Sequence, residues 1–233
     1  MKPQDKPMLL RLFEMKDRER VRAICCETGF LGNPIDPVFE DRELFADYLT
    51  RYYTDLEPES AWVLETNGSV CAYLLGCQKP QQKARFERWH NLRLFFKGLM
   101  RYLRYNAASR RFIRWILMHG RRQTPYTPPH AAHFHVNALP GSRSVQQTRA
   151  LINAFLKQLV RAGQKTVYGQ MVVFENRRGP ELFKRYGFSV VDQVEITKYR
   201  DVHPEPVYLY TVMRDLTGAS AEDPLLVEPA SNV

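Results

Sequence analysis

The sequence predicts a single mixed α/β domain, in which a mostly antiparallel sheet is flanked by helices. Two observations lead to this prediction. The runs AWVLET and SVCAYLLGC flank Asn67-Gly68, which is a strong signal for a β-hairpin. In the second half, a strand at 133–140, an amphipathic helix at 146–162 and a strand at 165–174 follow one another, as in a strand–helix–strand crossover.

The remaining elements follow from periodicity and end signals. A strand is expected at 8–13, and a helix at 16–29 that ends at Gly29. Asp41 is expected to cap a second helix, through about residue 53. Further helices are expected at 83–105, 108–119 and 177–187, and two final strands at 188–197 and 207–216.

Composition limits the class of protein. The chain has 233 residues, 44% of them hydrophobic and 25% charged, which is typical of a soluble globular protein. We expect one domain over 1–216 and a flexible tail over 217–233, which is rich in proline, alanine and acidic residues. No run is apolar enough for a membrane span or a signal peptide. The four cysteines show no metal-ligand spacing. Three of them lie in apolar surroundings, so we expect these to be small buried hydrophobic residues, and we expect a cytoplasmic location.

The net charge of +9 is concentrated in one segment. Residues 79–122 contain thirteen Lys/Arg and one acidic residue, Glu87, which leaves the rest of the chain near −3. We therefore treat 79–128 as a basic helical insertion. Its first helix carries one apolar stripe with a basic stripe beside it. The apolar stripe is Trp89, Leu92, Phe96, Leu99 and Leu103, and the basic stripe is Arg93, Lys97, Arg101 and Arg104.

Four interpretations of the insertion stay open. It could be a helical hairpin that packs its apolar stripe onto the body of the protein, or a lid that selects acidic acceptors. Its basic and aromatic side chains in 79–122 could instead bind nucleic acid or an anionic membrane surface. The aromatic content of this segment also leaves a homodimer open.

The chain resembles the GCN5-related N-acetyltransferase family over roughly residues 8–216. The resemblance is carried by the order of elements over 8–216, by HVNALP leading into the 146–162 helix, and by NRRGPELFKRYGF at 176–188. It implies the acyl-CoA N-acyltransferase fold and acetyl-CoA as cosubstrate. In the family, the strand before the helix binds the pantetheine arm and the following turn wraps the pyrophosphate, as helix N-termini do.

Carried over residue by residue, the resemblance implies a set of cofactor-binding positions. They are Asn137, Ala138 and Leu139 on the strand, Arg143, Ser144, Val145, Gln146, Gln147, Thr148 and Arg149 at the turn and helix start, and Asn176 and Phe183 downstream.

Two departures from the family pattern bear on activity. The turn has only Gly141, and Ser144, Gln146 and Thr148 stand where the family usually has glycine or alanine. Phe183 stands where the family usually has the tyrosine that protonates the leaving CoA thiolate. Tyr186, three residues further on, is on a similar helix face and is the candidate replacement.

Acyl transfer to an amine also needs a group that accepts the ammonium proton. His133 and His135 alternate on one strand, so both point to the same side and are the first candidates, although they could equally be structural. Glu175 is a further candidate. Tyr208 and Tyr210 alternate on the last strand and could line the acceptor site or pack in the core.

The function expected from these residues is N-acetylation of an amine of unidentified structure by acetyl-CoA. The alternatives are a weak or inactive acyl-CoA-binding module, and a nucleic-acid or membrane-surface binder that uses the basic insertion.

Overall fold

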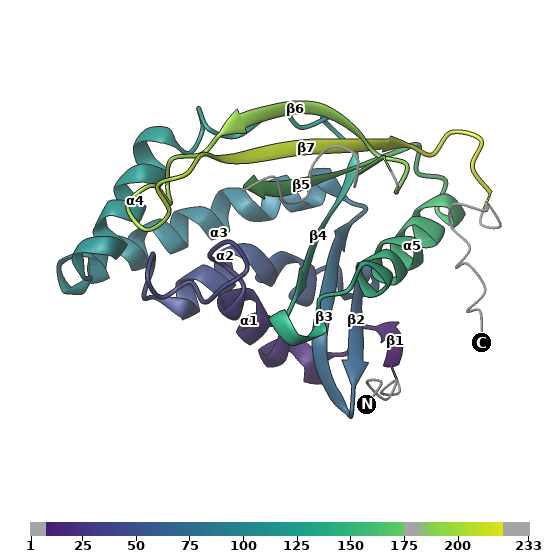
Figure 1. Ribbon diagram of the computed structural model, residues 1–233, viewed down its shortest axis with the longest axis horizontal. Helices are drawn as coiled ribbons and strands as arrows, with labels where there is room; N and C mark the ends of the chain where they lie inside the picture. The colour runs from purple at the N-terminus through teal and green to yellow at the C-terminus, as the bar shows by residue number, and fades with distance from the viewer. Residues whose placement is uncertain (1–7, 175–182, 185, 221–233) are drawn as a thin grey trace.

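The strands form one mixed sheet with a single parallel pair among the described residues. The computed structural model describes residues 8–174, 183–184 and 186–220. The strand order is β1-β2-β3-β4-β5-β7-β6, and only β4 and β5 pair in parallel (Figure 1). The bounds are β1 Met8–Leu12, β2 Ala61–Thr66, β3 Ser69–Cys77, β4 Ala132–Ala138, β5 Thr166–Phe174, β6 Ser189–Glu195 and β7 Val207–Asp215. The predicted fold class is confirmed.

Five α-helices lie in the described part. They are α1 Arg18–Glu27, α2 Arg42–Asp55, α3 Pro80–Arg101, α4 Ala107–His119 and α5 Val145–Arg161. Each matches a predicted helix to within a few residues at its ends. Most of the predicted 177–187 helix lies outside the described residues.

The hairpin turn forms where the Asn-Gly signal places it. Asn67 and Gly68 both have positive φ, 55° and 73°. This left-handed geometry matches the twist of the two flanking strands, and asparagine and glycine adopt it more readily than other residues. β2 and β3 consequently pair antiparallel from Ala61–Leu75 to Thr66–Ser69.

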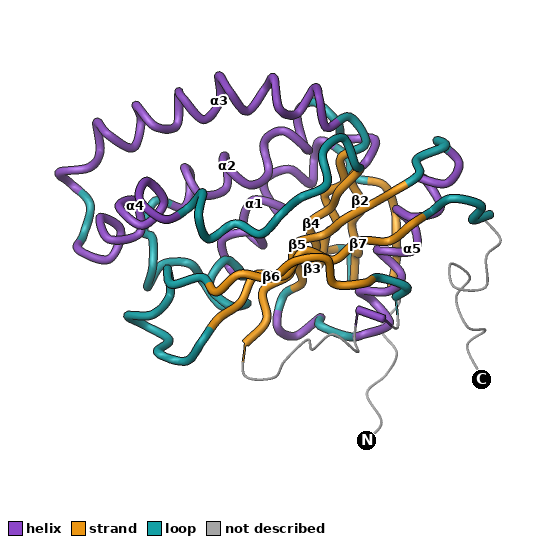
Figure 2. The backbone as a smooth tube through the Cα atoms, turned by 90° about the horizontal axis from the view of Figure 1, so that it is seen from above, coloured by secondary structure: helices purple, strands orange, loops and turns teal. Residues whose placement is uncertain are grey.

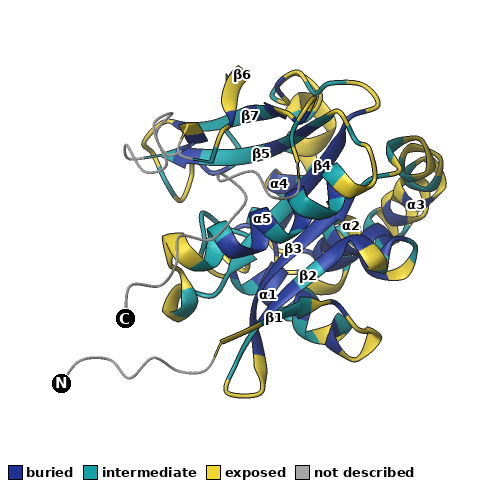
Figure 3. Cartoon of the chain, turned by 90° about the vertical axis from the view of Figure 1, so that its right-hand side faces the viewer, coloured by how far each residue is buried: buried dark blue, intermediate teal, exposed yellow. Residues whose placement is uncertain are grey.

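Two apolar cores lie on opposite faces of the sheet. The first contains α1 and α2 side chains such as Ile24 and Phe45, and the second contains the apolar face of α5 around Phe155 (Figure 3). Strand β3 contributes to both, which explains its uninterrupted burial after Ser69. Gly76 lies where Phe155 meets this strand, because a Cβ there would come within 2.3 Å of the Phe155 ring.

Asp41 joins the beginning of α2 to the end of α3. Its side chain accepts hydrogen bonds from the Leu44 N–H (2.9 Å), from Arg101 (2.8 Å) and from the Tyr105 hydroxyl (2.5 Å). Burial alone would raise the pKa of Asp41, but these donors outweigh it and hold the pKa below its ordinary value. The predicted cap is confirmed, and it also holds helix α3.

Of the four open interpretations of the insertion, the one in which it packs its apolar stripe onto the body is wrong. Helix α3 lies beyond α2 as seen from the sheet (Figure 2), and its apolar stripe faces solvent. Trp89 is 72% exposed and Leu103 is 87% exposed. The inward side instead carries His90, Leu94 and two members of the expected basic stripe, Lys97 and Arg101.

The inward side of α3 is held by polar contacts with α2. Lys97 pairs with Glu43 at 2.8 Å, and His90 Nε2 is 3.1 Å from the Asp47 carbonyl oxygen. Glu43 also pairs with Arg101. The inward side of α3 is thus the less apolar one, and its charged side chains pair with acidic residues at the start of α2.

All four cysteines are free thiols in buried positions, which confirms the burial expected for three of them. Cys25 and Cys26 lie on α1, and Cys71 and Cys77 lie on β3. Burial is the main cause that raises the pKa of Cys25 and of Cys77 to about 12 and that of Cys26 to about 11.

Candidate active site

Strands β4 and β5 separate after three residue pairs. They are paired in parallel only at Ala132–Val167, His133–Tyr168 and Phe134–Gly169, and then diverge (Figure 1). β4 continues to Ala138 paired with β3 alone. Backbone groups alternate between the two sides of a strand, so those on the β5 side beyond Phe134 have no partner strand in the described part. An open strand edge therefore leads from the pairing point towards α5.

The start of α5 presents backbone donors next to the end of β4. Ser144 is the N-cap, and its hydroxyl accepts from the Gln147 N–H at 3.0 Å. The Thr148 N–H donates to the Ser144 carbonyl. Among the described residues, the N–H groups of Val145 and Gln146 meet no acceptor. The buried Oε1 of Gln147 also lacks a donor there.

Arg143 braces the turn. Its guanidinium donates to the Ala138 carbonyl at 2.9 Å and to the Gly32 carbonyl, which ties the loop to the segment after α1. A Cβ on Gly141 would meet nothing within 4 Å. The one glycine of this turn is therefore not required by close packing within the chain. Arg149 is half-buried on the first turns of α5.

The downstream run is described only in part. Glu175 and Asn176 lie outside the described residues. Phe183 is 2% exposed and packs against Tyr210, with ring centroids 6.2 Å apart. The Tyr186 hydroxyl donates to the Val145 carbonyl at 3.2 Å. Tyr186 thus lies beside the start of α5, at the opposite end of β4 from His133.

The two histidines share a pocket with residues of α2, α3 and β5. This pocket has a volume of about 200 Å³. His133 Nε2 is 3.1 Å from the Tyr53 hydroxyl, and the His133 ring lies 5.2 Å from the Tyr168 ring. His135 lies edge-on to Tyr53 at 5.5 Å. The pocket is lined by Tyr48, Leu49, Tyr52, Tyr53, Lys83, Phe86, Glu87, His90, His133, Phe134, His135, Tyr168 and Gln170.

Burial and one cation keep both imidazoles neutral. The pKa of His135 falls to about 4, first because burial penalises the charged ring and second because Lys83 is near. Burial, Lys83 and His135 hold the pKa of His133 well below its ordinary value, and a weaker contact with the Ala131 backbone acts in the opposite direction. Burial likewise raises the pKa of Tyr168 to about 12. At neutral pH the pocket therefore holds two unprotonated imidazoles and a protonated phenol.

Two buried polar atoms beside the pocket lack partners in the described part. They are Nε2 of Gln170 and Nδ1 of His133; the contact of His133 with the Ala131 backbone does not meet hydrogen-bond geometry. Buried polar atoms are nearly always hydrogen-bonded, so unpaired ones on pocket-lining residues indicate room for a polar ligand or water.

The pocket contains functional candidates that the sequence analysis did not single out. Tyr53 comes from α2, Lys83 and Glu87 from α3, and Tyr168 and Gln170 from β5. The only local signal was the alternation of Tyr168 and Gln170 in an apolar strand. Their position next to His133 depends on the β4–β5 register.

Other expected residues do not join this pocket. Tyr210 belongs to the core on the α5 side, where it packs against Phe183, and Tyr208 alternates with it on the same side of β7. The packing interpretation is therefore supported for Tyr210. Asn137 shares the histidine face of β4, and its side-chain amide donates to the Tyr73 hydroxyl at 2.9 Å.

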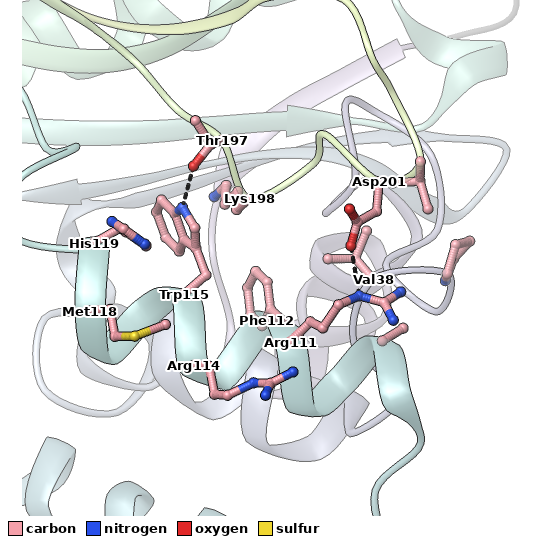
Figure 4. A pocket seen from close by; sticks show the side chains of 13 residues that line it. Val38, Arg111, Phe112, Arg114, Trp115, Met118, His119, Thr197, Lys198 and Asp201 are labelled. Atoms are coloured by element: carbon pink, nitrogen blue, oxygen red, sulfur yellow. Dashed lines mark hydrogen bonds and ion pairs between the residues drawn. The ribbon is translucent and has the colours of Figure 1, made fainter.

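A second cavity of about 270 Å³ lies between α4 and the segment after β6 (Figure 4). The Trp115 indole N–H donates to Thr197 Oγ1 at 3.0 Å, and Arg111 pairs with Asp201 at 2.6 Å. None of its lining residues belongs to β4, β5 or α5. We therefore do not place acyl-transfer chemistry there.

Comparison with solved structures supports the same fold. No family model and no curated protein matches the sequence. The protein named SsHAT is 24% identical with a TM-score of 0.56, over 89% of this chain and 98% of that chain. An N-acetyltransferase from Staphylococcus aureus Mu50 is 12% identical with a TM-score of 0.53, over 90% of this chain and 99% of that one. YncA from Salmonella typhimurium, solved with its cofactor acetyl-CoA, is 13% identical with a TM-score of 0.50, over 94% and 99% of the two chains.

The chain has the acyl-CoA N-acyltransferase fold, which is the fold of the GCN5-related N-acetyltransferases. The fold expected from the resemblance over residues 8–216 is confirmed. Chemistry must be argued from the site, because one fold serves many activities.

Proposed function

We propose that the protein transfers an acetyl group from acetyl-CoA to a compact amine. One observation carries this proposal: the open edge of β4 connects the start of α5 with the histidine pocket. A thioester laid along this edge would have its phosphates at one end and its acyl group at the other, beside the pocket.

The cofactor would be held mainly by backbone groups. The open side of β4 beyond Phe134 offers peptide groups to the amides of the pantetheine arm. The N–H groups of Val145 and Gln146, at the positive end of the α5 dipole, suit the pyrophosphate. Arg149 would add charge, and Arg143 would hold the turn in shape. Because this binding site for the pyrophosphate is built from backbone N–H groups at a helix start, it does not require a second glycine.

The acceptor would enter the histidine pocket. Its volume of about 200 Å³ is small for a ligand site, and its walls are largely aromatic. Such a site favours a small amine with an apolar body. Glu87 is the one acidic residue among the lining residues and would attract the ammonium form. The aromatic walls and Lys83 favour loss of the proton once the amine is inside.

His133 and His135 would accept that proton transiently. Both are neutral for the reasons given above, and Tyr53 provides a hydrogen-bonded path away from His133. The nitrogen lone pair then attacks the thioester carbonyl and the C–S bond breaks. The nitrogen loses its second proton as the amide forms, and this proton replaces the one that is given to the CoA thiolate. Tyr168 is our candidate for protonating the CoA thiolate, because its phenol stays protonated and adjoins the pocket. Tyr186 lies at the phosphate end, where its hydroxyl is better placed to position the cofactor.

The test combines binding and turnover. Calorimetric titration with acetyl-CoA and with dephospho-CoA measures cofactor binding, and thiol release in the presence of a panel of small amines measures transfer. His133→Gln and Tyr168→Phe should retain acetyl-CoA binding and lower kcat by about 100-fold. Tyr126→Phe is the matched control, because Tyr126 is exposed and outside the pocket. Variants that turn over like the wild type would refute the assignment of roles, and absence of acetyl-CoA binding would refute the proposed function.

A second candidate is an acyl-CoA-binding protein without turnover. The buried Phe183, at the position of the family's usual tyrosine, favours it. Binding of acetyl-CoA without thiol release for any amine would support this candidate.

A further inference from the structure

The outer face of helix α3 is apolar and open. It consists of large side chains that point away from α2, and Leu103 in the next turn extends it. The members on the helix are Trp89, Leu92, Phe95, Phe96, Leu99 and Met100, each between 45% and 83% exposed. Figure 3 draws much of α3 in yellow, the colour of exposed residues.

The charge around this face has one sign. Arg85 and Arg88 are exposed near the start of α3, Arg93 near its middle, and Arg104 just beyond its end. Glu87 is the single acidic residue of 80–104 and is ion-paired with Lys83. The face therefore presents apolar side chains flanked by arginines, with no exposed carboxylate from its own helix.

The helix cannot turn this face inward without losing its fixed contacts. Arg101 pairs with Asp41 at 2.8 Å, Lys97 pairs with Glu43 at 2.8 Å, and His90 lies against the Asp47 carbonyl. Several of these groups are partly buried, and removing a partner would leave a charge desolvated. The exposure of the apolar face is thus a consequence of how α3 is held to α2.

We propose that α3 lies on an anionic lipid surface, with its outer face at the boundary between headgroups and acyl chains. A helix of this kind combines leucine, phenylalanine and tryptophan on one side with flanking arginines that reach the headgroup phosphates. No helix in the described part of the chain is long and apolar enough to cross a membrane, so the helix would lie in the plane of the surface. This inference does not depend on acyl transfer.

Other occupants fit this face less well. A twofold dimer through α3 would bring two identical sets of arginines together without exposed carboxylates to pair with them. Nucleic acid would neutralise the arginines but would leave Leu92, Leu99 and Leu103 without an apolar partner. An anionic lipid surface satisfies both the charge and the apolar side chains.

The experiment is co-sedimentation of the full chain with two kinds of vesicle. One kind is phosphatidylcholine alone, and the other contains phosphatidylglycerol as well. We expect binding to the anionic vesicles that weakens as salt rises from about 0.1 M to about 0.5 M. Leu92→Gln with Leu99→Gln should lower the partition coefficient at least about tenfold. Arg88→Gln with Arg93→Gln should lower it about 30-fold.

Matched controls separate this face from general effects. Arg161→Gln with Lys165→Gln removes two exposed positive charges elsewhere, and Leu9→Gln with Leu12→Gln removes two exposed leucines of β1. Both controls should bind anionic vesicles like the wild type. Urea unfolding of every variant checks that the fold is intact.

Three results would overturn the proposal. The first is failure of the wild type to sediment with anionic vesicles. The second is a dimer in solution that dissociates in the Leu92→Gln, Leu99→Gln variant, because the face would then be an interface between copies. The third is binding of duplex or single-stranded nucleic acid that displaces the vesicles and depends on the arginines but not on the leucines.

Discussion

Protonation of His135 should destabilise the fold in a defined pH range. In the folded protein its pKa is about 4, against an ordinary value of 6.5. Between these values the unfolded chain binds a proton that the folded chain does not. Stability therefore rises with pH through this window and is lost as pH falls from 6.5 towards 4.

The size of the effect follows from the shift. The lowering of the His135 pKa from 6.5 to about 4 corresponds to a loss of about 3 kcal/mol of unfolding free energy once the pH is below both values. Burial contributes most, and Lys83 is the cation that adds to it. Tyr53 and Tyr168 face the same pocket as uncharged phenols, and Glu87 is paired with Lys83. His133 titrates in the same direction, so the measurement must isolate His135.

The assay is urea unfolding followed by tryptophan fluorescence, in wild type and His135→Gln. The difference in unfolding free energy between the two proteins should shift by about 2.4 kcal/mol between about pH 7 and about pH 4.5, with the wild type losing more. Carboxylates titrate in both proteins, so their contributions cancel in the difference. The contribution of His133 cancels only in part, because His135 is one of the groups that lower the pKa of His133. If the unfolding free energies of the two proteins changed equally with pH, the reasoning would be refuted.

Three further predictions concern stability. Gly76→Ala should lower the unfolding free energy by about 3 kcal/mol, because the new Cβ would meet the Phe155 ring. Gly141→Ala should leave the unfolding free energy nearly unchanged, because a Cβ there meets nothing within 4 Å. Urea unfolding of the two variants checks both expectations. Asp41→Ala should lower the unfolding free energy by about 2 kcal/mol through loss of the α2 cap, and amide hydrogen exchange should show faster exchange at the start of α2. Tyr53→Phe removes the hydroxyl that contacts His133 and should lower the unfolding free energy by about 1 kcal/mol. The same variant should change the pKa of His133 only slightly, and NMR titration of the imidazole checks this.

The predictable part of the fold rests on local signals. The turn was predicted from Asn67 and Gly68, two residues that readily adopt positive φ, between two β-rich runs. The helix cap was predicted from Asp41, a carboxylate directly before a helical segment. The crossover from β4 through α5 to β5 followed from strand and helix periods alone. These features depend on neighbours in sequence, so one sequence is enough to predict them.

The orientation of α3 could not be predicted in the same way. Periodicity locates an apolar face, but it does not say whether the protein body or another partner covers it. The inward side carries Lys97 and Arg101, whose acidic partners Glu43 and Asp41 lie 54 and 60 residues earlier in the chain. That pairing depends on the three-dimensional arrangement of α2 and α3.

Only the part of the candidate site that depends on local sequence could be predicted. Alternation placed His133 and His135 on one side of their strand, and the structure brings both into one pocket. The partners of the pair, Tyr53, Lys83 and Tyr168, come from three other elements and depend on helix packing and strand register. The roles of all these residues remain the proposals stated above.

The rate at which the buried cysteines react with an alkylating reagent reports how often the surrounding structure opens. Cys25 and Cys26 lie on α1 and Cys71 and Cys77 on β3, so an alkylating reagent can reach each pair only when its element is transiently exposed. For Cys25, Cys26 and Cys77, the raised pKa makes reaction in the closed state slower still. Mass spectrometry of partly alkylated protein would then give the order in which the first helix and the middle of the sheet become accessible, without any introduced label.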